Sequence, residues 1–375
     1  GLPLRRRGSD QRSGRVGEDF PLHFKITDKL IFFRYNGRTC MLTNLFFTLN
    51  AVMPIVLVIA VGYFLKSIRL FDEKFFPLLN KLCFRCCLPC LLFFNVYNVE
   101  NISEISRYGK ICAFVVISIL IFFTAAVFII KHTVSDDRQK GVMIQASYRS
   151  NYAIIGLSLA MSISNGDSGL VVAASILSSV SIPLFNVLAI IALSLFVSED
   201  GKKVSVLSII KKIATNPLIL GVLAGILCLA IRYFIPISPD GTKIFTIKQN
   251  LPFVYKTIGM LAGTASTIAL IALGGNFTFS AISRLKYKII AGVLARTVIC
   301  PLVCLTVAFK VGFSSLEFPA LIALYGTPLA VSTVPMTAEM GSDAELAGQL
   351  VVWTTLSSAF TLFAIIFTCK QLGIL

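Results

Sequence analysis

The sequence predicts an all-α polytopic membrane protein, and three observations support this fold class. Of the 375 residues, 56% are hydrophobic and only 14% are charged, with a mean hydropathy of +0.84. Soluble domains, by contrast, carry roughly 25% charged residues. Apolar runs of about 20 residues, long enough to cross a bilayer as helices, recur along most of the chain.

These runs predict ten transmembrane helices. They cover residues 43–65, 75–98, 110–131, 141–163, 168–197, 212–235, 251–280, 288–310, 317–339 and 345–369. Residues 1–42 precede them and combine many arginines with no sustained apolar run. This segment also lacks the apolar core and cleavage site of a signal peptide. We therefore expect a basic tail that is disordered or not part of the native protein.

The formal net charge of +16 indicates membrane topology rather than nucleic-acid binding. Lys and Arg gather in the loops after spans one, three, five and seven, where the residues are Lys66, Arg69, Lys74, Lys131, Arg138, Lys140, Lys202, Lys203, Lys211, Lys212, Arg284, Lys286 and Lys288. Cytoplasmic loops are enriched in these residues. We expect a multi-pass protein of the cell (plasma or inner) membrane, with both termini on the non-cytoplasmic side.

The cysteine pattern does not indicate a metal site. Cys83, Cys86, Cys87 and Cys90 are spaced so that they share one helical face. Four thiols along one helix cannot surround a tetrahedral zinc ion, so helix packing is the better interpretation. The spans contain no GxGxxG, Walker or HExxH motif. We expect no metal, no other cofactor and no enzymatic activity.

Two predicted spans are interrupted. The ninth contains Gly326, Pro328 and Pro335, and a proline inside a helix costs about 3 kcal/mol. The fourth contains the polar residues 149–151. Broken helices survive in lipid only where protein or a wet cavity surrounds them, and matching breaks in two halves mark a transporter's binding site. A kink that merely serves packing is the alternative interpretation.

Ten spans divide into two halves of five. Because five is odd, the second half starts on the opposite side of the membrane, so any repeat is inverted. Spans four and nine then correspond to each other. We predict a 5+5 inverted repeat in which the broken helices 4 and 9 occupy matching places.

The chemistry expected at these two breaks is anion binding. Free N–H groups at a helix break favour an anion, and Asn151 can donate or accept hydrogen bonds. Arg149 and Arg296 have no counter-ion, because no Asp or Glu lies deep in a predicted span, unless they snorkel to the interface. The candidate substrate-binding residues are Asn151, Ser150, Arg149, Thr327, Pro328, Ser332 and Arg296, and the helix-break residues are Gly326, Pro328 and Pro335. Asn151 and the hydroxyls could instead satisfy only the local backbone.

Glu339 is the candidate site for a coupling ion. It follows Pro328 by about 16 Å of helix, which places it near the cytoplasmic end of span nine. A solvated helix end is the alternative interpretation. The sequence leaves both a proton and sodium open as the coupling ion.

Several short motifs occur in order along the chain: Pro54 to Gly62, Leu88-Pro89, Ser150-Asn151 to Gly156, Asn216-Pro217, Gly274-Gly275, Thr327-Pro328 and Ala338 to Ala347. From about Met41 onward they resemble the auxin efflux carrier family, in particular its bacterial malonate-transporter-like members. The resemblance implies a fold related to the bile acid:sodium symporters. Residues 43–98 and 212–280 would form a scaffold, and residues 110–197 and 288–370 a transport domain. In this fold the broken helices 4 and 9 would cross beside the substrate.

The resemblance also implies transport of organic anions, and it leaves a homodimer open because plant members are dimers. Plant carriers have a proline-rich crossing in the first half, whereas this chain has Ser150-Asn151. We therefore expect a secondary active transporter of a small mono- or dicarboxylate, malonate- or malate-like, that works by alternating access. The alternative is a transporter-like membrane sensor that binds an organic acid without translocating it. The expected partners are this anion, a proton or sodium, and the lipid bilayer, with no nucleic acid.

Overall fold

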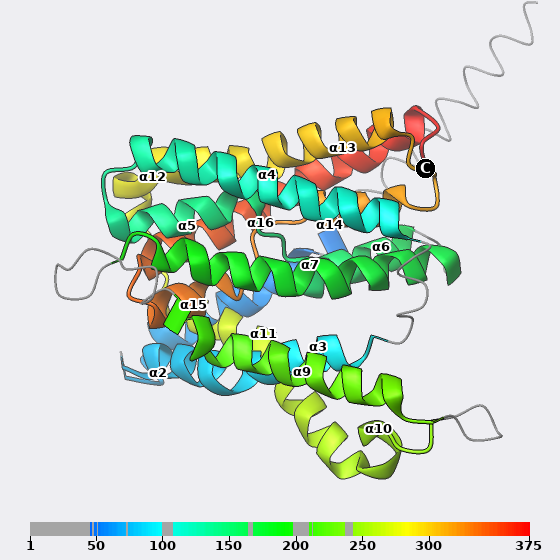
Figure 1. Cartoon of the computed structure of the whole chain (residues 1–375). Helices are drawn as coiled ribbons and strands as arrows, with labels where there is room; N and C mark the ends of the chain where they lie inside the picture. Colours follow the sequence, from blue (N-terminus) through cyan, green and yellow to red (C-terminus); the bar gives the residue numbers. More distant parts are fainter. Residues whose placement is uncertain are drawn as a thin grey trace, which may run out of the picture. The chain divides into compact units, whose positions relative to one another are not determined.

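The computed structural model describes residues 46, 49–50, 52–72, 74–99, 108–163, 168–197, 210–211, 213–236 and 243–375. Within these ranges the chain is almost entirely helical, and residues 44–375 form one compact unit (Figure 1). The prediction of an all-α polytopic membrane protein is confirmed. The predicted basic tail, residues 1–42, lies outside the described residues.

Seven helical segments of the described chain are long and apolar enough to cross a membrane. They correspond to α2 with α3 (Phe75–Tyr97), α4 (Gly109–Thr133), α7 (Ser168–Ser194), α9 (Pro217–Phe234), α11 (Pro252–Asn276), α12 with α13 (Ser280–Val311) and α16 (Ala344–Gln371). A shorter apolar helix covers residues 52–67, and α10 (Ile247–Asn250) is a single turn. All ten predicted spans overlap helix, while the count of ten and the inverted repeat stay predictions.

The two interrupted segments of the sequence are interrupted in the structure. In the first, α5 (Asp137–Tyr148) is followed by residues 149–151 and then by the helical residues 152–163, of which α6 is Leu157–Ile163. In the second, α14 (Phe318–Gly326) and α15 (Thr333–Glu339) are separated by residues 327–332. Each segment therefore consists of two half-helices joined by non-helical backbone.

In the described part of the chain, single π-helical turns occur at three places: η1 (Cys83–Cys87) between α2 and α3, η3 (Tyr152–Gly156) before α6, and η4 (Ala295–Ile299) between α12 and α13. A π turn widens the helix locally and changes the face on which the following side chains lie. Such turns are frequent at functional sites. The last of them carries Arg296.

The eighth predicted span begins earlier than expected. The sequence predicted a start at residue 288 and an end of the preceding span at residue 280, whereas α11 ends at Asn276 and α12 begins at Ser280. The first turns of α12 carry Arg284 and Lys288, which bind Glu345 and Gln139. The prediction from apolar runs left out these polar turns, although they belong to the helix.

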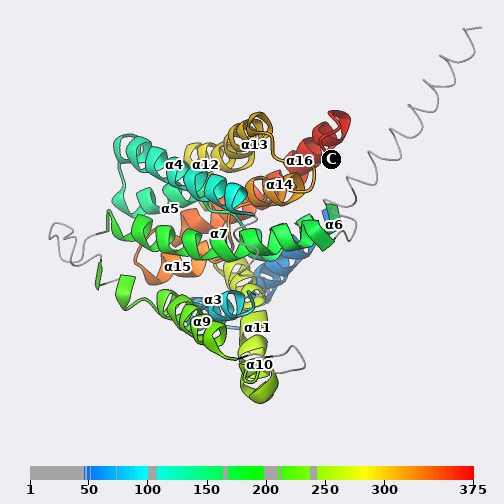
Figure 2. The ribbon, with the colours of Figure 1, turned by 45° about the vertical axis from the view of Figure 1, so that its right-hand side comes forward.

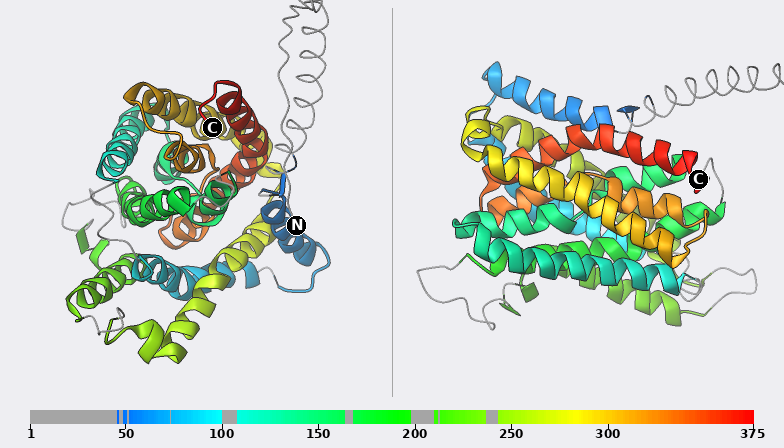
Figure 3. Two further views of the ribbon diagram at one scale, coloured as in Figure 1. Left: turned by 90° about the vertical axis from the view of Figure 1, so that its right-hand side faces the viewer. Right: turned by 90° about the horizontal axis from the view of Figure 1, so that it is seen from above.

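The helices pack in two sets. In the first set, α3 contacts α9 and α11. In the second set, α4, α5 and α7 contact one another, and α14 contacts α6, α13 and α16. Figures 2 and 3 show α3, α9 and α11 together on one side of α7 and α15. The assignment of residues 43–98 and 212–280 to a scaffold and of residues 110–197 and 288–370 to a transport domain stays a prediction.

Glycines let the helix of residues 52–67 touch α11 backbone to backbone. A Cβ atom added at Gly274 would lie 2.0 Å from the Ile59 carbonyl oxygen, and one at Gly62 would lie 2.2 Å from the Ile271 carbonyl oxygen. Small residues at helix contacts permit such close approach within a bilayer. The close contact therefore depends on glycine, which has no side chain, at both positions.

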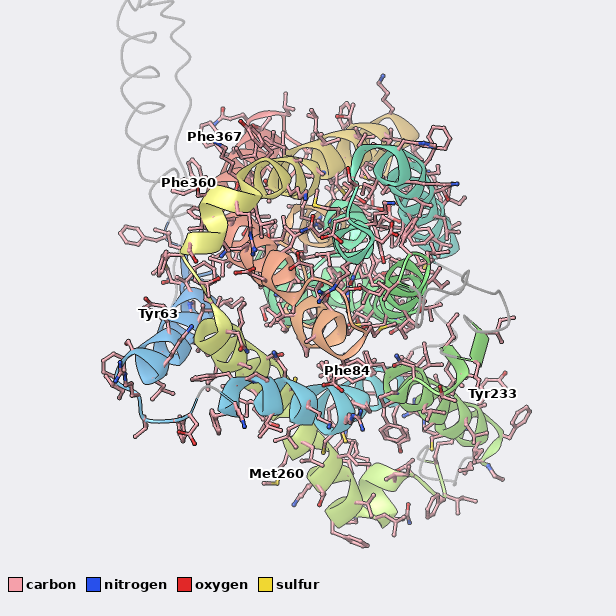
Figure 4. All side chains as sticks on the ribbon, turned by 90° about the vertical axis from the view of Figure 1, so that its left-hand side faces the viewer. Tyr63, Phe84, Tyr233, Met260, Phe360 and Phe367 are labelled. Carbon is pink, nitrogen blue, oxygen red and sulfur yellow. The ribbon has the colours of Figure 1, made fainter. Side chains whose placement is uncertain are left out.

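The outward-facing surface is apolar. Figure 4 shows Tyr233, Met260 and Phe360 pointing away from their helices, and these residues are 66%, 74% and 68% exposed. Soluble monomers rarely expose large contiguous apolar patches. Lipid is the solvent that accommodates this surface.

Candidate functional site

The two interrupted segments meet at their non-helical residues. Ser150 and Leu329 form an isolated antiparallel bridge, and the Asn151 N–H donates to the Pro328 carbonyl at 2.8 Å. The hydroxyls of Ser150 and Thr327 lie within hydrogen-bond distance, 2.7 Å apart. These residues are buried, so protein rather than lipid surrounds the irregular backbone, as the bilayer requires. We call residues 149–151 and 327–332 the crossing.

Proline and glycine explain the break after α14. Pro328 has no N–H and biases the preceding Thr327 toward extended backbone, where φ is −73° and ψ is 154°. Gly326 ends the half-helix at a crowded place, since an added Cβ would lie 2.5 Å from the Cδ2 atom of Leu362. Pro335 lies in the first turn of α15, where the missing N–H is not needed.

The break after α5 has no proline and depends on tertiary contacts. Arg149 leaves the helix with ψ at 119°, and Asn151 precedes η3. The Asn151 carbonyl accepts the N–H groups of Ile155 and Gly156 at 3.0 and 3.3 Å, which starts the second half-helix. The backbone bridge to Leu329 holds the residues between the two half-helices.

Arg149 lies at the crossing and is only 1% exposed. Its Nη1 donates to Gln145 Oε1 at 2.6 Å, and its Nη2 to Asn186 Oδ1 at 2.7 Å, Ser332 Oγ at 2.8 Å and Met336 Sδ at 3.1 Å. All four partners are neutral, and no ion pair among the described residues includes Arg149. Its Nε–H and its second Nη1–H donate to no described residue.

A small cavity of about 40 Å³ adjoins this guanidinium. The crossing supplies Arg149, Ser150, Asn151 and Ser332 to its wall, and apolar side chains of α3, α7 and α11 supply much of the rest. The Nδ2 atom of Asn151 is buried and has no hydrogen-bond partner among the described residues. The cavity therefore combines a buried positive charge with an unused amide donor.

A wider cavity of about 400 Å³ adjoins the small one. The two share the lining residues Asn95, Ala153 and Ile182. The wider cavity lies between α3 and the helices α6 and α7, and Asn98, Ser175, Ser178 and Ser179 make its wall partly polar. A partly polar cavity thus lies next to the small cavity that Arg149 lines.

Arg296 is 0% exposed, and protein atoms occupy its donors. Its Nε donates to the Thr327 carbonyl at 2.9 Å, its Nη1 to the Tyr148 carbonyl at 3.2 Å and to Cys300 Sγ at 3.5 Å. Its Nη2 donates to the carbonyls of Leu324 and Tyr325, both at 3.0 Å. A guanidinium has five N–H groups, so none is left for a substrate.

The sequence-predicted residues therefore separate into three places. Arg149, Ser150, Asn151 and Ser332 line the small cavity, whereas Thr327, Pro328 and Arg296 form the buried backbone contact behind it. Glu339 lies elsewhere, in an ion pair with Arg85 at 3.3 Å.

Sequence reasoning missed two polar side chains that bind Arg149. Asn186 lies in α7, and Gln145 lies one helical turn before Arg149 in α5. An asparagine inside the apolar run of residues 168–197 was the available signal. The spacing of four between Gln145 and Arg149 was the other.

We expect Glu339→Gln to lower stability by no more than about 1 kcal/mol, because its partner Arg85 has a 64% exposed side chain. Anion binding should be unchanged, because Glu339 does not line the small cavity. Thermal unfolding and ligand titration of the purified variant measure both quantities. A loss of the response of uptake to a pH gradient would instead assign Glu339 to ion coupling.

No group of three or more His, Cys, Asp or Glu residues in the described part of the chain is arranged to hold a metal ion. Cys83 and Cys87 are buried and Cys86 and Cys90 are half-buried, all as free thiols. Cys83 Sγ donates to the Ala265 carbonyl of α11 at 3.2 Å. This contact is helix packing.

Comparison with known proteins decides the family. A family model described as a membrane transport protein matches residues 47–366, which is most of the chain. The chain belongs to this family. The resemblance of its motifs to the auxin efflux carrier family is thereby confirmed, and the chain is a multi-pass membrane transport protein with a transported substrate.

This membrane transport protein also resembles an archaeal protein. It is 23% identical over 314 residues to Uncharacterized transporter MJ1031 of Methanocaldococcus jannaschii. The alignment covers 82% of this chain and 95% of the relative. Nearly the whole length of the relative is thus aligned with this chain.

Proposed function

We propose that the protein is a secondary active transporter of a small organic anion, a mono- or dicarboxylate of malonate or malate size. The single observation that carries the proposal is the buried charge of Arg149, which has no anionic partner among the described residues and adjoins a cavity. Isolated buried charges are costly and are normally paired. An anionic substrate would provide the missing charge.

The donors at the cavity support a carboxylate in particular. The Nε–H and second Nη1–H of Arg149 have no described acceptor, and Asn151 Nδ2 is unused. A guanidinium and a carboxylate form strong, charge-assisted hydrogen bonds. The cavity of about 40 Å³ has room for only a few water-sized groups, which favours a small anion over a large aromatic one.

We further propose that the anion crosses the cell membrane by alternating access. The partly polar cavity beside Asn95, Asn98 and Ser179 supports one route to the site. By the loop charges this route opens on the non-cytoplasmic side. Relative movement of the proposed scaffold and transport domain would expose the crossing to the other side. The chain has no Walker motif, so the proposed energy source is a gradient.

A ligand screen tests the proposed function. The purified protein would be heated with a series of small mono- and dicarboxylates and with neutral analogues of equal size. A ligand at 100 times its dissociation constant adds about 2.7 kcal/mol to stability. We expect a carboxylate to raise the melting temperature and to exchange across liposomes. Binding without exchange would indicate a sensor, and no response to any anion would contradict the proposal.

We expect Asn186→Asp to abolish anion binding while the protein stays folded. The Asn186 Oδ1 lies 2.7 Å from Arg149 Nη2, so a carboxylate there would become the internal counter-ion. A nearly isosteric carboxylate fixed at position 186 would neutralise Arg149, so no uncompensated positive charge would be left for the substrate. Thermal unfolding with and without the carboxylate measures the effect.

Asn276→Asp is the matched control. Asn276 Nδ2 donates to the carbonyl four residues earlier at 2.8 Å, as Asn186 Nδ2 also does, but Asn276 lies in α11 away from Arg149. We expect this variant to bind the carboxylate as the wild type does. Wild-type binding by Asn186→Asp as well would mean that Arg149 does not hold the anion.

A further inference from the structure

Four backbone carbonyls converge on the guanidinium of Arg296. Three come from the C-terminal end of α14, namely those of Leu324, Tyr325 and Thr327, and the fourth is that of Tyr148 at the end of α5. The donor–acceptor distances are 2.9–3.2 Å. One positive group therefore binds the ends of both half-helices that enter the crossing.

The ends of these half-helices attract cations. Each C-terminus carries unsatisfied carbonyls and a partial negative charge of about half an elementary charge. Two such ends directed at one point repel each other unless a cation lies between them. In transporters with broken helices, the carbonyls at these ends coordinate a coupling sodium ion. In this chain the Arg296 side chain lies there.

The local structure places Arg296 at this point. It lies on the π-helical turn η4, and its neighbours in that turn include the buried Thr297. No ion pair among the described residues includes Arg296, and its fifth donor binds the Cys300 thiol. The carbonyls of the two half-helices are thus its principal polar partners. Their partial charges compensate the guanidinium and hold it in place.

We propose that Arg296 is a tethered cation that replaces a bound sodium ion at the crossing, so that neither folding of the crossing nor anion binding requires sodium. Arg296 is then a positioning residue, because it orients the ends of α5 and α14, which lead directly into residues 149–151 and 327–332. The part of this inference that concerns anion binding rests on the proposed function. The part that concerns the crossing does not, because it can be measured without ligand.

The wild-type protein provides the first test. Its thermal unfolding would be measured without ligand in sodium, potassium and choline chloride at equal ionic strength, and anion binding would be titrated in the same three salts. We expect equal melting temperatures and equal dissociation constants in all three. A rise in melting temperature, or tighter anion binding, that sodium alone produces would overturn the proposal. Absence of anion binding in every salt would contradict the proposed function but leave the ligand-free result valid.

Variants of Arg296 provide the second test. We expect Arg296→Ala to lower the ligand-free melting temperature on the order of 10 °C, because two helix ends lose their cation. Guanidinium ion at low concentration should restore part of this loss in Arg296→Ala. It should not stabilise the wild type, since it is ordinarily a denaturant. Arg296→Lys, which keeps a cation, should lie between the two.

Arg284→Ala is the control for loss of a positive charge, because Arg284 is exposed and pairs with Glu345 at the protein surface. We expect no rescue of this variant by guanidinium. An Arg296→Ala protein as stable as the wild type, or one that guanidinium only destabilises, would overturn the proposal. If Arg296→Ala does not fold, Arg296→Lys and the wild-type salt series still decide it.

Discussion

Replacing Arg149 with Gln is expected to weaken carboxylate binding by roughly 100-fold or more and to stop uptake into liposomes. The substrate would lose the only guanidinium among the described residues that line the small cavity. Gln retains an amide but no charge, so hydrogen bonding to Asn186 or Ser332 can persist in part. Titration calorimetry and radiolabel uptake measure the two effects.

Stability should respond differently from binding in this variant. The substitution removes a buried charge as well as its bonds to Gln145, Asn186 and Ser332, and these changes offset each other. We therefore expect a smaller change in the melting temperature of the ligand-free protein than in binding. Arg284→Gln removes an exposed arginine and should preserve binding. Equal binding by Arg149→Gln and the wild type would place the anion elsewhere.

Gly274→Ala is expected to cause the largest loss of stability of any single methyl addition considered for α11. The new Cβ would lie 2.0 Å from the Ile59 carbonyl oxygen and 2.8 Å from the Tyr63 nitrogen. Both are backbone atoms, so no side chain can rotate away and the helices must separate. Overpacking typically costs about 1–3 kcal/mol, and backbone displacement makes the upper part of that range the expected value. Thermal unfolding in one detergent measures it.

Gly263→Ala in the same helix is the matched control. A Cβ at Gly263 would meet no atom within 4 Å. Alanine is favoured over glycine in a helix by about 1 kcal/mol, so this variant should be as stable as the wild type or slightly more stable. The two substitutions add the same methyl group to one helix and should change stability in opposite directions. A Gly274→Ala protein that unfolds at the wild-type temperature would contradict the close backbone contact.

Local sequence was sufficient to predict where the membrane helices break. Pro328 together with Gly326 disfavours a continuous helix, and the polar residues 149–151 stand out within an apolar run, whereas Pro183 lies inside the continuous helix α7. That the two breaks meet followed from the family resemblance, which implies that spans four and nine cross. In the structure the two breaks meet at the main-chain bridge between Ser150 and Leu329.

The different surroundings of the two arginines could not be predicted from their positions. Neither arginine has a carboxylate partner, so the sequence predicted the same role, anion binding, for both. Their roles depend on distant contacts: Arg149 meets the side chain of Asn186, and Arg296 meets the carbonyls of α14. The π-helical turn that carries Arg296 has no signature in the sequence comparable with a proline. Tertiary packing decides which arginine faces a cavity.

The contact that joins the two interrupted segments is made by main-chain atoms. The Asn151 N–H and the Pro328 carbonyl form the bond, and every residue type supplies a carbonyl, while all except proline supply an N–H. Mutation can therefore exchange a cavity-lining side chain such as Ser332 without removing this main-chain bond. Selection for a new nutrient or a new waste product could act on cavity-lining positions such as Ser332 and Asn186 alone. A main-chain contact that is independent of side chains thereby allows proteins with this fold to bind different substrates.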